Sequence, residues 1–297
     1  MRAVIATGLA ALCLAGATAW GAPITFNTAL PVHQGGWVLR EQVIYRKIAD
    51  DATAARRDLR LAGVVSVLGY GVSRDLAVFG LLPWFDRRLE LRSAGQNLER
   101  GTQGFGDLSL MARYTAYERN SPGRTFRVAP FVAVKAPTGS DDARDRLGRL
   151  PPSLQPGSGA WDLLAGAVST WQTLDFQLDG QLSYRTNGEA NGFRAGDVVR
   201  FDGSLQYRLW PRRLAGGVPA FVYGVLEANL IHAARDRVGV TRDLNSGGTT
   251  LFVSPGLQYV TRKWIVEAGV QIPLLQDLNG TALGYDFGLS AGFRVNF

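Results

Sequence analysis

The chain has 297 residues, a formal net charge of +7 and a single cysteine. A basic balance can indicate nucleic-acid binding, but these arginines are spread over many predicted strands and loops, so nucleic acid is not an expected partner. No run of about 18 apolar residues follows the N-terminal segment, which excludes a membrane-spanning helix. No break in composition divides the chain, which predicts a single domain.

The N-terminal residues have the features of a secretory signal. A charged residue precedes a short apolar run, and Ala17-Thr18-Ala19 has the spacing of a cleavage site. We therefore predict a signal peptide over residues 1–19 and one barrel domain over residues 20–297. Cys13 lies inside the signal, so the mature chain has no thiol for a disulfide or a cysteine-bound metal, and no cofactor is expected.

Alternation of apolar and polar residues predicts five strands in the first half of the chain. In most of them one face is apolar and the other polar, as expected when one side meets lipid and the other an interior. In the third strand we assign Phe79 and Phe85 to lipid, and Asp86 and Arg88 to the interior. The facing of the second strand stays open. The predicted strands are 37–47, 60–71, 76–91, 108–114 and 126–135.

A long connection, residues 136–159, leads to seven more predicted strands. It is rich in Asp, Arg, Pro and Gly, and its length marks it as a functional or disordered loop. The next strand has no clear facing, whereas the two after it form the clearest hairpin, with Phe201 and Leu205 toward lipid and Asp202 toward the interior. The predicted strands are 161–171, 176–184, 199–209, 220–232, 250–260, 264–275 and 282–297.

Strand length and number both favour a membrane barrel. The strand at residues 282–297 alternates along its whole length, whereas strands of soluble sandwiches commonly run about 5 to 6 residues and transmembrane strands about 9 to 11. Twelve is an even number, and short connections mostly alternate with longer polar ones. We predict an all-β, transmembrane, antiparallel up-and-down β-barrel of about twelve strands in the bacterial outer membrane.

Two further patterns bear on this barrel. Aromatic residues repeatedly end the strands that run toward the periplasm, which is typical of an interfacial girdle. Against the prediction, Pro83, Pro130, Pro255 and Pro273 lie within predicted strands, where each removes a ladder hydrogen bond. We expect a bulge or a strand end near each of these prolines.

The inward positions carry charges of both signs in similar numbers. Such an interior favours ion pairs between strands and gives little selectivity for one sign of charge. For each residue, pairing and hydration of the interior is the simpler alternative to contact with a solute. The predicted lumen-lining residues are Arg40, Arg88, Asp107, Arg113, Arg127, Asp179, Arg200, Asp202, Arg208, Glu227, Glu267, Asp286 and Arg294.

An enzyme on a barrel scaffold is a competing class. A hydrolase needs a nucleophile and a base within hydrogen-bond reach, and the chain has only two histidines, His33 before the first strand and His232 on an outward position. Gly157-Ser158-Gly159 lacks the G-x-S-x-G spacing of a nucleophile elbow, and no metal or nucleotide-binding motif occurs. We predict no enzyme; a structural or adhesive barrel is the second interpretation, and a surface hydrolase the third.

Three stretches carry a resemblance to a known family. They are RVAPFVAVKAPTG at residues 127–139, LQPGSGAWD at 154–162 and GLQYVTRKWIVEAGVQIPL at 256–274. They resemble the outer-membrane barrels named for the meta-pathway of phenol degradation, which are described as transporters. The resemblance implies uptake of hydrophobic or aromatic compounds, and it assigns no ligand-binding residue to this chain.

The sequence therefore predicts a monomeric channel that passes small solutes by diffusion through a mixed-charge lumen. The expected partners are outer-membrane lipids, the barrel assembly machinery and a small-molecule solute. Phe293, Val295 and Phe297, on the last apolar face, are the expected assembly signal. The loop at residues 136–159 is expected to control passage, because its charges keep it hydrated and its prolines keep it stiff.

Overall fold

The computed structural model of the protein describes residues 21–93, 95–213 and 220–297. The predicted signal peptide and most of the connection at residues 211–219 lie outside the described residues. No helix within the described ranges is long and apolar enough to cross a membrane.

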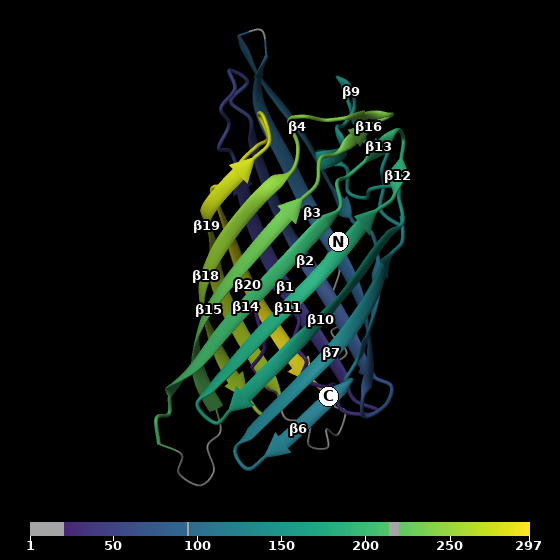
Figure 1. Ribbon diagram of the computed structural model, residues 1–297. Coiled ribbons are helices and arrows are strands. Elements are labelled where there is room, and N and C mark those ends of the chain that lie inside the picture. The colour runs from purple at the N-terminus through teal and green to yellow at the C-terminus, as the bar shows by residue number, and fades with distance from the viewer. Residues whose placement is uncertain (1–20, 94, 214–219) are drawn as a thin grey trace, which may run out of the picture.

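Twelve strands of the described chain close into an antiparallel barrel, shown in Figure 1. The ring closes because the last strand pairs with the first. This confirms the prediction of an all-β up-and-down barrel of twelve strands. The strands are β1 (Trp37–Ile48), β2 (Asp58–Gly71), β3 (Leu76–Ser93), β5 (Ser109–Tyr114), β7 (Arg124–Lys135), β10 (Asp162–Thr173), β11 (Phe176–Asn187), β14 (Val198–Trp210), β15 (Ala220–Ala233), β18 (Gly248–Thr261), β19 (Trp264–Leu278) and β20 (Phe287–Asn296).

Shorter elements extend the ends of the barrel. β4 (Gln96–Phe105) pairs with the far part of β3, and β6 (Tyr117–Ser121) pairs with the start of β7. At the end with the longer loops, two hairpins join into a small four-stranded sheet, and a third hairpin precedes a 3-10 turn. These elements are β8 (Arg144–Asp145), β9 (Gly148–Arg149), η1 (Pro152–Leu154), β12 (Glu189–Ala190), β13 (Phe193–Arg194), β16 (Arg237–Val238) and β17 (Thr241–Arg242).

The facing of β11 and β14 follows their alternation. Phe201 is 60% exposed and points outward with Leu182 and Leu205, whereas Asp179 and Asp202 are buried inside. The register pairs Leu182 with Phe201 and Gln181 with Asp202, so like faces lie side by side. Apolar residues therefore cover the outside of the wall and polar residues the inside, as a barrel in lipid requires.

The predicted facing of β3 is wrong. Phe79 is buried inside the ring, where the Arg113 guanidinium lies 4.9 Å from the centre of its aromatic ring. Arg88 lies on the opposite, outward face, where its side chain is 62% exposed and pairs with Asp86 at 3.0 Å. Apolar side chains face inward here because they pack against guanidinium groups, which attract aromatic faces. Arg88 therefore does not line the lumen.

Each proline within a strand marks an irregularity, as the sequence predicts. Pro83 and Pro130 border the two ladders of β5, which pairs with β3 only as far as Leu81 and with β7 only as far as Phe131. The ladder between β18 and β19 is interrupted at Pro255, and its register shifts beside Pro273. The barrel accommodates residues without an N–H by ending or shifting the pairing next to them.

Exposed aromatic side chains lie at the ends of the strands that run toward the chain termini. Tyr114, Trp171, Tyr207, Trp210 and Tyr259 all have exposed side chains at these positions. Such rings are stable where an apolar band meets water, so they indicate one edge of the membrane-facing surface. We call this end, with the short turns, the inner end, and the end with the long loops the outer end.

Candidate functional site

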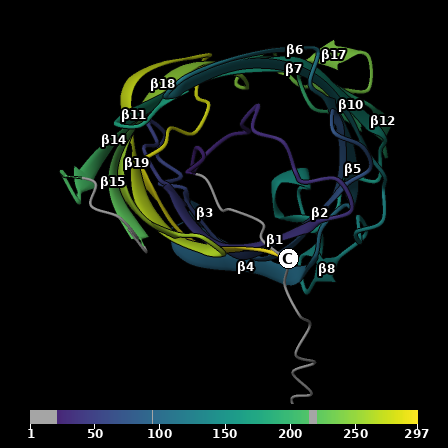
Figure 2. The same cartoon turned by 90° about the horizontal axis from the view of Figure 1, so that it is seen from below.

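The interior of the barrel is the candidate site, and part of the chain itself occupies it. Residues 21–31, here called the inner segment, run inside the ring of strands, as the purple trace in Figure 2 shows. Ala22, Ile24, Ala29 and Leu30 of this segment are buried. The segment forms no strand, so the hydrogen bonds of its backbone must be made in another way.

Side chains of the wall supply many of those hydrogen bonds. The Glu227 carboxylate accepts from the backbone N–H groups of Ile24 at 2.6 Å and Thr25 at 3.0 Å. The carbonyl of Ile24 accepts from Arg40 Nη2 at 2.6 Å and from Gln42 Nε2 at 3.0 Å. A charged acceptor and a charged donor thus hold successive peptide groups of the segment, and such hydrogen bonds are among the stronger ones in proteins.

Arg113 holds the second part of the inner segment. Its guanidinium donates to Asn27 Oδ1 at 2.7 Å, to the carbonyl of Thr28, and to the carbonyl of Leu30 at 2.6 Å. On the neighbouring wall, Thr170 Oγ1 accepts from the N–H of Ala29 at 2.9 Å. The buried cation is solvated by carbonyl oxygens of the segment, so losing either partner would leave buried polar groups unpaired.

Inward glycines make room for the apolar side chains of the segment. A Cβ atom at Gly256 would lie 2.6 Å from Ile24 Cδ1, which is too close for any larger residue without movement. Ala29 packs with Phe131 and Val168 of the wall. The inside of this barrel is therefore polar around the backbone of the segment and apolar around its side chains.

The buried charges of the wall also pair with one another. Glu267 lies 2.5 Å from Arg40 Nη2 and 3.8 Å from Arg294 Nη2. Asp202 lies 2.9 Å from Arg200 Nη2 and accepts from Asn229 and Gln181 as well. These contacts fit the simpler interpretation of the mixed-charge interior, in which the charges neutralise each other, between strands for Glu267 and along β14 for Asp202.

The inner segment occupies the inner half of the barrel. Arg113 lies at the end of β5, Thr170 lies near the end of β10, and Asp179 lies near the start of β11, all at the inner end of the ring. Arg40 lies near the start of β1, which begins at the same end. The segment therefore narrows the lumen on the side of the short turns.

A second segment enters the outer half. Residues 136–159, here called the outer loop, connect β7 with β10, and Figure 2 shows the teal part of this loop inside the ring. Arg87, an inward residue of β3, donates to the carbonyl oxygens of Ser153 and Gln155. Leu150 and Leu154 of the loop are buried. The predicted functional loop thus folds against the inner wall.

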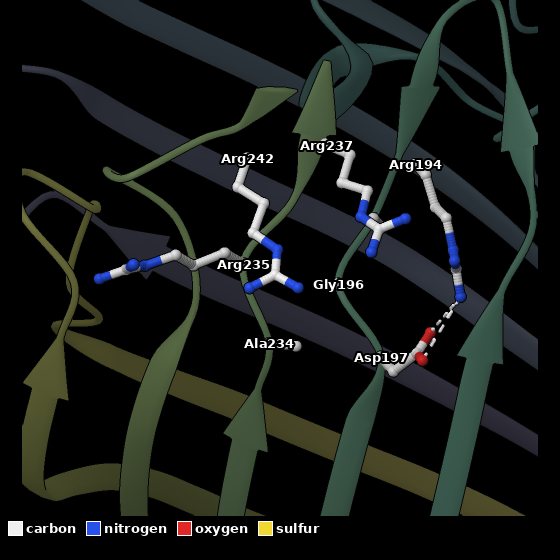
Figure 3. Close-up of a pocket in the computed structure, with 8 residues that line it drawn as sticks. Arg194, Gly196, Asp197, Ala234, Arg235, Arg237 and Arg242 are labelled. Carbon is white, nitrogen blue, oxygen red and sulfur yellow. Dashed lines mark hydrogen bonds and ion pairs between the residues drawn. The ribbon is translucent and has the colours of Figure 1, made fainter. Parts of the chain in front are cut away.

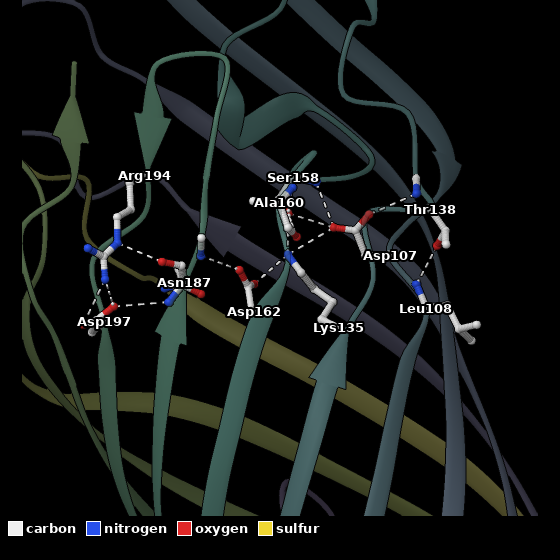
Figure 4. Close-up of polar contacts among 12 residues, drawn as sticks. Asp107, Leu108, Lys135, Thr138, Ser158, Ala160, Asp162, Asn187, Arg194 and Asp197 are labelled. Carbon is white, nitrogen blue, oxygen red and sulfur yellow. Dashed lines mark hydrogen bonds and ion pairs between the residues drawn. The ribbon is translucent and has the colours of Figure 1, made fainter.

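Figure 4 shows how the ends of the outer loop are fixed. Asp107 accepts from the backbone N–H groups of Gly139 and Ser158, each at 2.9 Å. Lys135 Nζ lies between Asp107, at 3.1 Å, and Asp162, at 2.6 Å. Ser158 donates its hydroxyl to Asp107 and accepts from Lys135, so this serine is part of the network that fixes the loop.

The structure places the other predicted lumen residues at several levels. Arg127 pairs with Glu118 at 2.9 Å on the inner rim, and Arg208 pairs there with Asp175. Asp286 lies beside Lys47 at the outer rim. The residues that lie within the ring are Arg40, Arg113, Asp179, Arg200, Asp202, Glu227, Glu267 and Arg294.

Sequence reasoning missed the inner segment altogether. It assigned no role to the residues between the predicted signal and the first strand, although Ile24, Phe26 and Leu30 form an apolar stretch there. The polar wall residues Gln42, Thr170 and Gln258, which contact this segment, were not singled out either. The only signal in the sequence was an apolar stretch with no partner strand of its own.

The residues expected to form the assembly signal lie on the last strand. Phe293 is exposed on the outer face, and its ring lies 6.3 Å from that of Trp264. Val295 shares that face by alternation. Phe297 exchanges backbone hydrogen bonds of 2.9 and 2.6 Å with Trp37.

Comparison with known families decides the relationship of this barrel. Residues 59–289 match the family described as "Putative MetA-pathway of phenol degradation". The chain belongs to this family. The resemblance seen in the three sequence stretches is thereby confirmed. Among curated proteins, none matches the chain significantly.

Solved structures similar to this family member are outer-membrane barrels. An outer membrane channel from Pseudomonas putida F1 matches over 94% of this chain and 100% of its own length, with a TM-score of 0.65 and 15% sequence identity. The β domain of the Bordetella autotransporter BrkA (13% identity, 89% of this chain, 100% of that chain, TM-score 0.47) and the NanC porin (13%, 86%, 98%, TM-score 0.45) are less similar. The first comparison shows that this chain has the fold of that channel.

Proposed function

We propose that this protein is an outer-membrane channel that admits small solutes by diffusion and is narrowed by two segments of its own chain. The observation that carries the proposal is the inner segment, which side chains hold inside a complete ring of strands. Because the segment contributes no strand to the wall, it can shift without breaking the ladder of the barrel. The fold shared with the Pseudomonas channel supports the same function.

Small aromatic or other hydrophobic compounds are the proposed solutes. The family description names phenol degradation, and the inner wall offers two places where an aromatic ring and a guanidinium group lie together. Arg87 lies 4.8 Å from the ring centre of Phe85, and Arg113 lies 4.9 Å from that of Phe79. The chain itself covers both places, because Arg113 holds the inner segment and Arg87 the outer loop. Movement of these segments would open both places to the ring and the hydroxyl group of a phenol.

Reconstitution separates this proposal from its alternatives. Purified protein in planar bilayers should give discrete conductance steps, and proteoliposomes should swell faster in phenol-sized solutes than in disaccharides. A structural or adhesive barrel would give neither result, and a surface hydrolase would cleave lipid or peptide substrates in the same preparation. Uptake of labelled phenol by a deletion strain, with and without the gene restored, tests the solute class directly.

The last strand also supports a role in assembly. We infer that Phe293, Val295 and Phe297 are recognised by the barrel assembly machinery, because Phe293 and Val295 share one outward face beside the closing pair of strands. Deleting Phe297 should leave protein in the periplasm. Normal amounts of heat-modifiable barrel in the membrane after this deletion would contradict the inference.

A further inference from the structure

An arginine-lined pocket lies at the outer end of the barrel, apart from the lumen. The connections β13–β14 and β15–β16 run side by side there, with the N–H of Ala234 donating to the carbonyl of Asp197 at 2.8 Å. Between them is a cavity of about 290 Å³. Four arginines line it, as Figure 3 shows: Arg194, Arg235, Arg237 and Arg242.

The pocket has an excess of positive charge. Asp197 is the one acidic residue of its lining, and Arg194 neutralises it at 3.1 Å. The nearby carboxylate of Asp236 accepts from the backbone N–H of Gly196. Arg237 and Arg242 are exposed and form no ion pair with any residue in the described part of the chain. Two guanidinium groups are therefore free to bind an anion from outside.

The pocket opens on the outside of the wall rather than into the lumen. Asp197 and Ala234 continue the outward alternation of Val199 and His232, which pair with each other in the ladder of β14 and β15. Tyr184, exposed on the outer face of β11, donates its hydroxyl to Asp197 at 2.8 Å. The arginines consequently lie just beyond the apolar band, at the height where lipid head groups begin.

The chemistry of the pocket selects one kind of ligand. Guanidinium groups match the geometry of phosphate oxygens, and basic pockets at membrane surfaces bind phosphorylated head groups. We propose that this pocket binds a phosphate group of the phosphorylated glycolipid in the outer leaflet. This inference rests on the proposed outer-membrane location, but it does not require that the barrel conduct solutes.

Binding of lipid A to the purified, detergent-solubilised barrel tests the proposal. The probes are bisphosphorylated lipid A, the same lipid after removal of both phosphates, and inorganic phosphate. The Arg237→Gln/Arg242→Gln variant should bind bisphosphorylated lipid A at least about tenfold more weakly than the unaltered protein, because two charge-assisted contacts are lost. Dephosphorylated lipid A should bind the unaltered protein as weakly as the variant binds the intact lipid.

A matched control distinguishes binding at the pocket from a general effect of removing positive charge. Arg119→Gln/Arg124→Gln removes the same charge from exposed residues at the inner end, and should leave lipid A affinity within about twofold. Three results would overturn the proposal: equal affinity of the pocket variant, equal binding of the dephosphorylated lipid, or full competition by inorganic phosphate at equal concentration. The last would indicate a site for free anions. Conductance of the pocket variant, measured separately, reports on the channel function alone.

Discussion

The two segments inside the barrel are held in different ways. The backbone of the inner segment bonds to side chains of the wall, chiefly those of Glu227, Arg40 and Arg113. The outer loop bonds largely to itself, because β8 pairs with β9 and the side chain of Gln155 bridges Ala143 and Leu150. The inner segment, which has no internal strand pairing, depends on the wall along its length, whereas the outer loop has pairing of its own and is held in addition by Arg87 and Arg100.

Because the two segments are held differently, removing each of them should have different consequences. Removing the inner segment would expose the wall charges that hold it, and these could then hydrate in the open lumen. Removing the outer loop would leave Arg87 and Arg100 without their partners in the loop, while Lys135 would keep its ion pairs with Asp107 and Asp162. We therefore expect each segment to restrict passage through the lumen independently of the other. Both effects require an intact barrel wall.

The largest expected effect is a loss of stability when the lipid-facing side of the wall is changed. Leu205→Arg places a charge on the lipid-facing side of β14 and should cost about 2 to 4 kcal/mol of unfolding free energy near the midplane. Asp202→Asn, on the inward side of the same strand, should cost much less, because the amide oxygen still accepts from Arg200 and Asn229. Gln181 can turn its own oxygen, which has no partner among the described residues, toward the new NH2 group. Unfolding from lipid vesicles measures both, and equal costs would contradict the assigned facing.

Deleting residues 22–31 should give the next largest effect. The inner half of the lumen would then be free of the chain, and single-channel conductance should rise severalfold while heat-modifiability shows an intact barrel. The ring should persist because the segment forms none of its ladder. Unchanged conductance in a correctly folded deletion variant would show that the constriction lies elsewhere.

Shortening the outer loop should raise conductance by a smaller factor. Replacing residues 141–155 with a Gly/Ser turn removes the part of the loop that Arg87 holds, while the contacts of Asp107 to Gly139 and Ser158 remain. Loop length alone changes stability only slowly, so the fold should survive. A conductance equal to that of the unaltered protein would reject control by this loop.

Loosening the inner segment without removing it should have a smaller effect on mean current. Arg113→Gln removes charge-assisted bonds worth about 1.5 to 3 kcal/mol each, so closed intervals in single-channel records should shorten about tenfold or more. Arg208→Gln is the control, since Arg208 is buried at the inner rim but pairs with Asp175 instead. Identical records for the two variants would argue against Arg113 as an anchor.

The smallest expected effect is a pH dependence of stability, which arises in the connection between β1 and β2. The side-chain hydrogen bond from Arg57 holds the pKa of Asp51 well below its ordinary value. The stabilisation that ionised Asp51 contributes is therefore fully present above about pH 4, the pKa of an aspartate in the unfolded chain. It is lost as the pH falls through the pKa of Asp51 in the folded protein. Asp51→Asn should cost about 1 kcal/mol at pH 7 and less at pH 3, with Asp75→Asn as an exposed control. A cost independent of pH would contradict this assignment.

Alternation predicted the wall well and the contents of the lumen poorly. Phe201 and Asp202 could be assigned to opposite faces because lipid and a polar interior make opposite demands on a strand. That rule failed at Phe79 and Arg88, because an interior filled by protein accepts aromatic side chains. The inner segment could not be predicted, since nothing in residues 22–30 themselves shows that wall side chains will replace a partner strand.

The shortness of β5 has a mechanical consequence. β5 has six paired positions with β3 and five with β7, whereas β15 and β18 are paired at fourteen. A strained barrel should separate first at the ladders with the fewest paired positions. Two prolines, Pro83 and Pro130, border these ladders. We expect stretching or heating to open the barrel along β5, with its amides exchanging before those of β15.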